Sequence, residues 1–258
     1  MTQFRPSRFE ILPPVIKNLL IINALVFLAQ NTVGKSYFNM DDIFALHTWQ
    51  SPLFEPWQFI THLFMHGGFD HIFFNMFSLW MFGSVLENLW GPKRFLTFYF
   101  ICGLGAALCH MIVLFFENQS MISAFYTINP NAEDYLLNAQ HFIDKYIPTP
   151  QTVPINIQTA KEIVDVRLNE ATLGASGAVF GCLVAFGYLF PNTTLMIFPI
   201  PIPIKAKWFV LFYAAYELYS AVRNSAGDNV AHFAHLGGAL VGFLLVYFWN
   251  KNNRKTFY

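Results

Sequence analysis

The stretch Phe95–Phe116, FLTFYFICGLGAALCHMIVLFF, decides the fold class because it contains no acidic, lysine or arginine side chain. A helix needs roughly 20 apolar residues to cross the hydrocarbon core of a bilayer, and this run is long enough. Two similar runs follow it, Ala171–Phe190 and Val230–Trp249, and only His232 and His235 interrupt the second of them. We therefore predict that the chain crosses a membrane as helices.

The composition of the whole chain also indicates a membrane protein. Charged residues make up 12% of its 258 residues, about half of the share typical of soluble domains, while 55% are apolar and the mean hydropathy is +0.42. An aromatic share of 18% argues against disorder, and a formal net charge of zero gives no basic surface for nucleic acid. Three cysteines inside apolar runs are too few for a disulfide framework.

Three further runs are less purely apolar, namely Val15–Gln30, His71–Trp90 and Ala206–Val222. Each carries a few polar side chains, among them Glu87 and Glu217, and such groups in membrane helices normally face the interior of the helix bundle. With these runs included, the sequence predicts an all-α membrane protein with six membrane-spanning helices.

The distribution of basic residues predicts the orientation, because cytoplasmic loops carry an excess of lysine and arginine. Lys93 and Arg94 lie in the turn after the second run, and Lys205 and Lys207 lie at the start of the fifth. Basic residues near both ends of the chain fall on the same side of a six-span arrangement. We expect both termini to be cytoplasmic.

Two segments between the runs are not expected to span, within what we treat as a single membrane domain over residues 1–258. Residues 31–70 are rich in aromatic side chains, which suits an outer loop associated with the membrane interface. Residues 117–170 hold seven acidic and three basic residues and lie between the third and fourth helices as an extracytoplasmic insertion. Helical spacing of apolar residues over Glu133–Tyr146 and Gln158–Asn169 predicts two helices within it.

The short sequence Gly174-Ala-Ser-Gly177 places Ser176 among small residues at the outer end of the fourth run. Small residues allow another backbone to approach the hydroxyl closely, although the same pattern is typical of simple helix packing. A serine hydroxyl is a weak nucleophile until an adjacent base takes its proton. Ser176 is therefore a candidate nucleophile that needs a partner.

His235 lies near the outer end of the sixth run, within Ala234-His-Leu-Gly-Gly-Ala-Leu-Val-Gly242. Gly238 and Gly242 form a G-x-x-x-G pattern, which lets a neighbouring helix come very near. If that neighbour is the fourth span, His235 can reach Ser176 as its base, without an acid to orient the imidazole. The alternative is a histidine that is only hydrogen-bonded inside the bundle.

His71 and Asn75 are spaced i, i+4, so their side chains share one face of the second predicted helix. Together they could donate hydrogen bonds to a developing oxyanion, or they could simply link two helices. No H-E-x-x-H motif accompanies the remaining histidine pairs, and we expect neither a metal ion nor a cofactor.

Taken in order, the H-x-x-x-N, G-x-S-G and A-H-x-x-G-x-x-x-G motifs resemble those of the rhomboid intramembrane serine proteases. The resemblance covers about Val15 to Trp249 and leaves out the insertion over residues 117–170. It implies a six-transmembrane-helix rhomboid-like bundle that cleaves transmembrane or juxtamembrane segments of membrane proteins through an acyl-enzyme. The expected partners are transmembrane protein substrates and the lipid bilayer, and not nucleic acid.

The resemblance also implies a role for each motif residue. Ser176 looks like the nucleophile and His235 like its general base, together forming a Ser-His dyad. His71 and Asn75 look like oxyanion stabilisers, helped by the Ser176 backbone N–H. Gly174 is expected among the same oxyanion- and substrate-binding residues.

Further positions resemble supporting features of the family. Phe180 occupies the place of an aromatic residue that packs on the catalytic histidine, and Gly238 and Gly242 support the close approach of helices. Glu87, four residues after Gly83, resembles a structural Gly-x-x-x-Glu feature. Gln58 stands where many members have an arginine, so we expect the role of that arginine to be absent.

The resemblance places the chain in a bacterial inner or cell membrane, with its active site opening to the extracytoplasmic side. Two other readings stay open. A catalytically inactive rhomboid-like protein would bind membrane clients without cutting them, but such proteins typically lack the serine or the histidine. A transporter or channel would use polar residues along its path, but the sequence shows no inverted repeat of broken helices.

Overall fold

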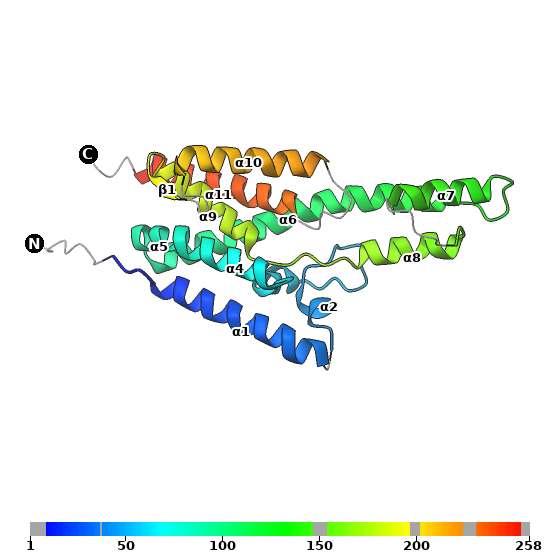
Figure 1. The fold of residues 1–258 in the computed structure, drawn as a ribbon, viewed down its shortest axis with the longest axis horizontal. Coiled ribbons are helices and arrows are strands. Elements are labelled where there is room, and N and C mark those ends of the chain that lie inside the picture. The colour runs from blue at the N-terminus through cyan, green and yellow to red at the C-terminus, as the bar shows by residue number, and fades with distance from the viewer. Residues whose placement is uncertain (1–8, 37, 147–153, 197–201, 224–230, 254–258) are drawn as a thin grey trace, which may run out of the picture.

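The computed structural model describes residues 9–36, 38–146, 154–196, 202–223 and 231–253, and this part of the chain is mostly helical (Figure 1). Within these residues, each of the six predicted spans overlaps a helical segment of one bundle, although the fourth helix begins at Ser176 and not at Ala171. The segments are α1 (Pro14–Ser36), the continuous run of α4 (Phe69–Ser78), the π-helical turn η2 (Leu79–Gly83) and α5 (Ser84–Trp90), α6 (Pro92–Tyr126), α9 (Ser176–Leu189), α10 (Ala206–Arg223) and α11 (His232–Asn253).

Four of the described helices are long and apolar enough to cross a membrane, which confirms an all-α membrane protein. They cover Pro14–Gly34, Phe69–Trp90, Pro92–Tyr126 and His232–Lys251. α9 is apolar but has only 14 residues, and α10 is not among the four. Six crossings and two cytoplasmic termini therefore stay predictions. The start of α1 and the end of α11 do lie at the same end of the bundle (Figure 1).

α6 is much longer than its apolar sequence predicts, because it continues through Tyr126 instead of ending near Phe116. Its 35 residues extend roughly 50 Å, well beyond the ~30 Å hydrocarbon core of a bilayer. The boundary predicted at residue 117 is therefore wrong as the end of a helix. The polar residues that begin there end an apolar run without breaking the helix, since glutamate and glutamine are good helix formers in water.

Two helices of the insertion, α7 (Tyr135–Tyr146) and α8 (Ile157–Leu168), lie beside the far end of α6 (Figure 1). They confirm the helices expected over Glu133–Tyr146 and Gln158–Asn169. A separate apolar core joins the three elements, formed by Met121, Ile128, Ala139, Phe142, Ile143, Ala160, Ile163 and Val164. The insertion is thus built on an extension of a bundle helix.

The loop between α1 and α4 contains α2 (Met40–Phe44), α3 (Gln58–Thr61) and the single turn η1 (His62–Phe64). Two short strands, β1 (Thr194–Met196) and β2 (Pro203–Lys205), pair antiparallel between α9 and α10. The first of these connections is called the α1–α4 loop below. An isolated bridge joins this loop to the segment that leads into α9. Leu46 and Thr172 exchange both backbone hydrogen bonds, at 3.0 and 2.8 Å. The bridge fixes the entry to α9 four residues before Ser176.

Gln58 anchors the α1–α4 loop, at the position where the family resemblance indicated that an arginine is missing. Its side chain is fully buried, with Nε2 donating to the Leu53 carbonyl at 2.8 Å and Oε1 accepting from the His47 N–H at 3.1 Å. The amide therefore links both arms of the loop without bringing a charge into the interior.

Glu87 holds the start of α1 against α5. Its two carboxylate oxygens accept the backbone N–H groups of Val15 and Ile16, both at 2.9 Å. Unpaired N–H groups of a first helical turn favour a negative charge, so Glu87 acts as a cap supplied by another helix. Gly83 allows the contact, since a Cβ there would lie 2.6 Å from the Ile16 side chain.

Candidate active site

α11 packs directly on α9 because both helices carry glycine where they meet. A Cβ on Gly238 would overlap the carbonyl of Gly177, and one on Gly242 would lie 2.8 Å from the carbonyl oxygen of Gly181. The G-x-x-x-G pattern predicted a close neighbouring helix, and that neighbour is α9, which meets the condition under which His235 could reach Ser176. This contact brings the N-terminal parts of the two helices together.

Ser176 and His235 lie on facing parts of these helices. α9 begins at Ser176, and Phe180, one turn later, stacks on the His235 ring with centroids 4.4 Å apart and an interplanar angle of 9°. The carbonyl oxygen of Ala234 lies 3.3 Å from the position of a Cβ on Gly177. Among the hydrogen bonds of the described residues, none joins Ser176 to His235. Such bonds are often long in ligand-free enzymes and shorten with substrate.

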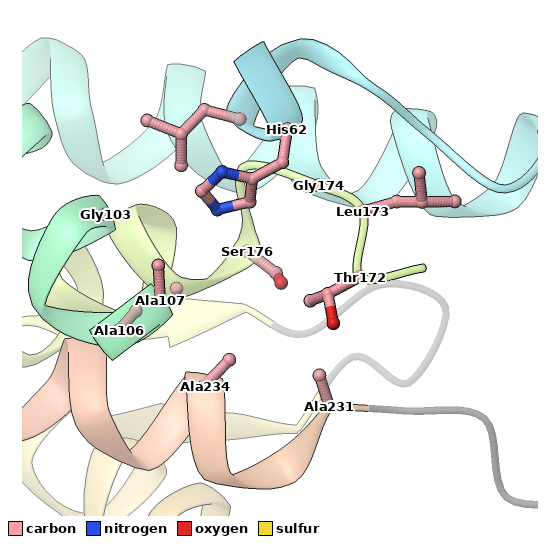
Figure 2. Close-up of a pocket in the computed structure, with 12 residues that line it drawn as sticks. His62, Gly103, Ala106, Ala107, Thr172, Leu173, Gly174, Ser176, Ala231 and Ala234 are labelled. Carbon is pink, nitrogen blue, oxygen red and sulfur yellow. The ribbon is translucent and has the colours of Figure 1, made fainter. Parts of the chain in front are cut away.

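The side chain of Ser176 faces a small cavity of about 10 Å³, which has space for about one water molecule (Figure 2). His62 and Thr172 line one side of this cavity, and Ala231 and Ala234 of the α11 end line another. The nucleophile predicted from the sequence is therefore only partly buried, and within the described part of the chain no polar side chain forms a hydrogen bond with its hydroxyl.

Gly174 brings the predicted oxyanion residues next to the start of α9. Its φ of +113° is a conformation that favours glycine, and its N–H donates to the His62 carbonyl at 2.9 Å. A Cβ at this position would lie 2.7 Å from His71 Nε2 and 3.7 Å from Asn75 Nδ2. Both side chains thus converge on the backbone two residues before Ser176, as the i, i+4 spacing requires.

The hydrogen bonds of His71 assign its tautomer. The N–H of Gly67 donates to His71 Nδ1 at 3.3 Å, so in the neutral ring the proton is on Nε2, the atom that faces Gly174. Asn75 Nδ2 donates to the His71 carbonyl at 3.0 Å and has a second proton to offer. Two N–H donors therefore lie beside the segment that carries Ser176.

Glu217 of α10 contacts His235, and the sequence did not reveal this contact. Glu217 Oε2 accepts a hydrogen bond from His235 Nδ1 at 3.0 Å and another from His232 Nδ1 at 2.6 Å. Glu217 is only 2% exposed. The sequence had shown Glu217 only as a polar interruption of an apolar run. The signal that could have found it is chemical, because a carboxylate inside a bundle needs donors.

Glu217, His232 and His235 are also of the residue types that bind transition metals. His232, His235 and Glu217 offer ligand atoms that lie within 4.8 Å of one another, and all three residues are buried. Two imidazoles and a carboxylate make up the protein ligand set of many catalytic zinc sites. Hydrogen bonds between the imidazoles and the carboxylate also account for this geometry.

His62 and His66 lie outside the long apolar helices, in the loop that leads to α4. Burial lowers the pKa of both imidazoles to about 4, since it disfavours the charged form. His62 is thus neutral at pH 7, with its Nδ1 donating to the Gln58 carbonyl at 2.7 Å. His62, which lines the cavity beside Ser176, therefore brings no positive charge to it at pH 7.

Comparison with known proteins gives one family and several named relatives. A family described as eukaryotic integral membrane protein (DUF1751) matches residues 16–257. Rhomboid protein 1, mitochondrial, of Saccharomyces cerevisiae is 25% identical over 196 residues, which are 76% of this chain and 42% of the relative. Rhomboid protease AarA of Providencia stuartii is 24% identical over 196 residues, covering 73% of this chain and 54% of the relative.

One relative is named as inactive. Inactive RHOMBOID-like protein 8 of Arabidopsis thaliana is 36% identical over 70 residues, which are 27% of this chain and 19% of the relative. The chain spans about half the length of the first relatives that it matches. The eukaryotic family and the mitochondrial relative support an integral membrane protein, but they do not support the bacterial cell membrane expected from the sequence.

Proposed function

The chain belongs to the eukaryotic integral membrane family (DUF1751) and, with its named relatives, to the rhomboid family, and on this premise we propose that it is an intramembrane serine endopeptidase. The observation that carries the proposal is the stacking of His235 on Phe180, one turn after Ser176. This contact holds a base over the same helix face as a serine that lines a cavity.

The first step forms a bond between Ser176 Oγ and the carbonyl carbon of the scissile peptide. His235 takes the proton from Oγ as the bond forms, because an unassisted hydroxyl is a poor nucleophile. The C–N bond then breaks, and His235 returns the proton to the leaving amine. An acyl-enzyme on Ser176 remains.

Negative charge develops on the former carbonyl oxygen during this step. His71 Nε2–H, the free N–H of Asn75 and the backbone N–H of Ser176 are the donors that would stabilise it. The positions of His71 and Asn75 at Gly174 support this role. Donors fixed in advance are effective here because they need no reorganisation when the charge appears.

Hydrolysis of the acyl-enzyme needs water at a site among membrane helices. The cavity beside Ser176 has space for one water molecule next to the hydroxyl. His235 would remove a proton from this water as its oxygen bonds to the acyl carbon. The bond between the acyl carbon and Ser176 Oγ then breaks, and the same proton passes from His235 to Oγ to restore the hydroxyl. Small side chains at the cavity keep this space open.

The proposed substrates are transmembrane or juxtamembrane segments of membrane proteins. A helix in lipid hides its backbone groups, and a protease must extend the chain before it can attack. We expect cleavage near helix-breaking residues at one end of the substrate helix, where this cost is smallest.

Cleavage in lipid vesicles tests the proposal. The wild-type protein and Ser176→Ala would be reconstituted with a panel of single-span reporter proteins that carry glycine or proline at the end of their helix. We expect the wild type alone to cleave at least one reporter, with a product end inside or next to the span. Equal cleavage by both proteins would reject Ser176 as the nucleophile.

A client-binding protein without activity is the second candidate, favoured by the relative that is named inactive. It would hold the same reporters without cutting them. Stable co-purification of an intact reporter with the folded wild type, and no product over long incubation, would favour this candidate over the protease.

A further inference from the structure

We propose that Glu217 is a positioning residue that holds His235 in the tautomer and orientation needed for catalysis. The inference rests on the proposed protease function and replaces its Ser-His pair with a Ser-His-Glu arrangement. The observation behind it is the hydrogen bond of 3.0 Å between Glu217 Oε2 and His235 Nδ1.

The direction of this hydrogen bond defines the state of the base. An ionised carboxylate can only accept hydrogen bonds, so the proton of the His235 ring is on Nδ1. Nε2 is then the unprotonated nitrogen, which is the form that a general base requires. Without the carboxylate, the neutral ring can also adopt the other tautomer, in which Nε2 carries a proton and cannot accept one from Ser176.

α10 fixes the ring of His235 through two of its residues. Glu217 holds Nδ1, and Tyr213, one turn earlier, contacts Phe180 with ring centroids 4.7 Å apart. Phe180 in turn covers one face of the imidazole. The ring is therefore restrained both along its edge and on its face, which limits rotation away from α9.

His232 holds the carboxylate in place. Its Nδ1 donates to the same Oε2 atom at 2.6 Å, and its position three residues before His235 puts both rings on one face of α11. Two charge-assisted donors on one oxygen fix the carboxylate more firmly than one. His232 thus acts on catalysis through Glu217, and Glu217 acts through His235.

Fluorophosphonate labelling provides a test that needs no known substrate, because the probe reacts with an activated serine. The second-order labelling rate constant would be measured for the wild type and for Glu217→Gln. We expect the amide to slow labelling about 10²- to 10⁴-fold, as a misplaced tautomer does in serine proteases with a triad. Glu217→Asp retains the carboxylate and should recover part of this loss.

Glu87→Gln is the matched control. Glu87 is also 2% exposed and also accepts two hydrogen bonds, but its donors are backbone N–H groups of α1, outside the proposed catalytic machinery. Its labelling rate per folded molecule should equal that of the wild type. A purely structural effect of losing a buried carboxylate would instead slow both variants alike.

A double variant separates positioning from general damage. In a His235→Ala background, the substitution Glu217→Gln should cause no further loss, because Glu217 acts only through the imidazole. If the Gln variant does not fold, His232→Gln and Glu217→Asp provide the test, and both should label at rates between those of the wild type and His235→Ala.

The outcomes distinguish the inference from the function on which it rests. No labelling of folded wild type contradicts the protease itself. Labelling of the wild type together with an equal rate for Glu217→Gln overturns the positioning role alone. Stoichiometric zinc in the purified protein, with labelling lost on chelation, would also overturn it, because the three side chains would then be metal ligands.

Discussion

Two buried carboxylates sit in different parts of the bundle, and they show how similar burial can serve different purposes. Glu87 of α5 and Glu217 of α10 are each 2% exposed, and each accepts two hydrogen bonds. The donors to Glu87 are backbone N–H groups of α1, which keep their protons at every relevant pH. The donors to Glu217 are two imidazoles, which can give up and take up protons.

The difference lies in the donors, because burial and the number of hydrogen bonds are the same. A carboxylate on backbone N–H groups can only fix the position of a helix end. A carboxylate on an imidazole determines which ring nitrogen is free to act as a base. We therefore expect Glu87 to contribute to stability and Glu217 to activity, and the predictions below test this division.

The largest expected effect is at the nucleophile and its base, in the half of the molecule that contains Glu217. Ser176→Ala and His235→Ala should each lower reporter cleavage by about 10⁴-fold or more, since residues that act as a unit fail together. Vesicle assays with both variants measure the loss. A His235→Ala protein that keeps most of its activity would show that His235 is not the base, and Glu217 could then have no role in activity through it.

The next effect is at the oxyanion donors. Asn75→Ala should lower kcat by about 10²- to 10³-fold, the usual cost of removing one such donor. Asn23→Ala is the control, because Asn23 is buried and its Nδ2 also donates to the carbonyl four residues earlier, Leu19, at 2.8 Å. Equal losses of kcat in the two variants would show that Asn75 is only a helix-packing residue.

A smaller effect, on stability alone, is expected at the structural carboxylate. Glu87→Gln keeps the shape but replaces charged acceptors, and we expect the unfolding free energy to fall by about 1.5–3 kcal/mol. Thermal unfolding in detergent measures this change. If the variant unfolds like the wild type but cleaves more slowly, the assignment of Glu87 as a cap is wrong.

The smallest expected effect concerns pH and the buried loop histidines. The pKa of His62 is about 4 in the folded protein and near 6.5 when unfolded, so the unfolded chain binds the proton first as the pH falls. The contribution of the neutral His62 ring to the unfolding free energy is therefore present above pH 6.5 and is lost progressively as the pH falls towards 4. Near pH 5.5 the unfolding free energy should be lower by about 1.4 kcal/mol.

Unfolding midpoints from pH 7.5 to 5 test this for the wild type and His62→Gln, with exposed His141→Gln as the control. The pH dependence should be weaker in His62→Gln than in the wild type and His141→Gln. His66, whose pKa is also about 4, should account for part of what remains. Three identical slopes would contradict the assignment.

Much of the bundle and of the site was predictable from the sequence, because membrane helices and close helix contacts leave strong local patterns. The apolar runs predicted the helical segments, and Gly238 and Gly242 predicted a helix at van der Waals distance, which proves to be α9. His71 and Asn75 were predictable as a pair because their spacing follows the helical repeat.

The rest depended on contacts between distant segments. Glu217 and His235 are 18 residues apart on different helices, and no local pattern shows which donors a buried acid will meet. The sequence indicated only that an arginine is missing at Gln58, since it does not show that an amide there reaches Leu53 and His47. The end of α6 was missed because hydropathy predicts where lipid ends, and the helix continues beyond it.

The proposed protease depends on an activated serine at position 176, and mapping of a covalent adduct detects such a serine. Folded wild type and His235→Ala would be treated with a fluorophosphonate and analysed by peptide mass spectrometry. We predict a single adduct on Ser176 in the wild type, and the same adduct formed about 10⁴-fold more slowly in His235→Ala. An adduct on another residue, or an unmodified Ser176 in folded wild type, would contradict the account.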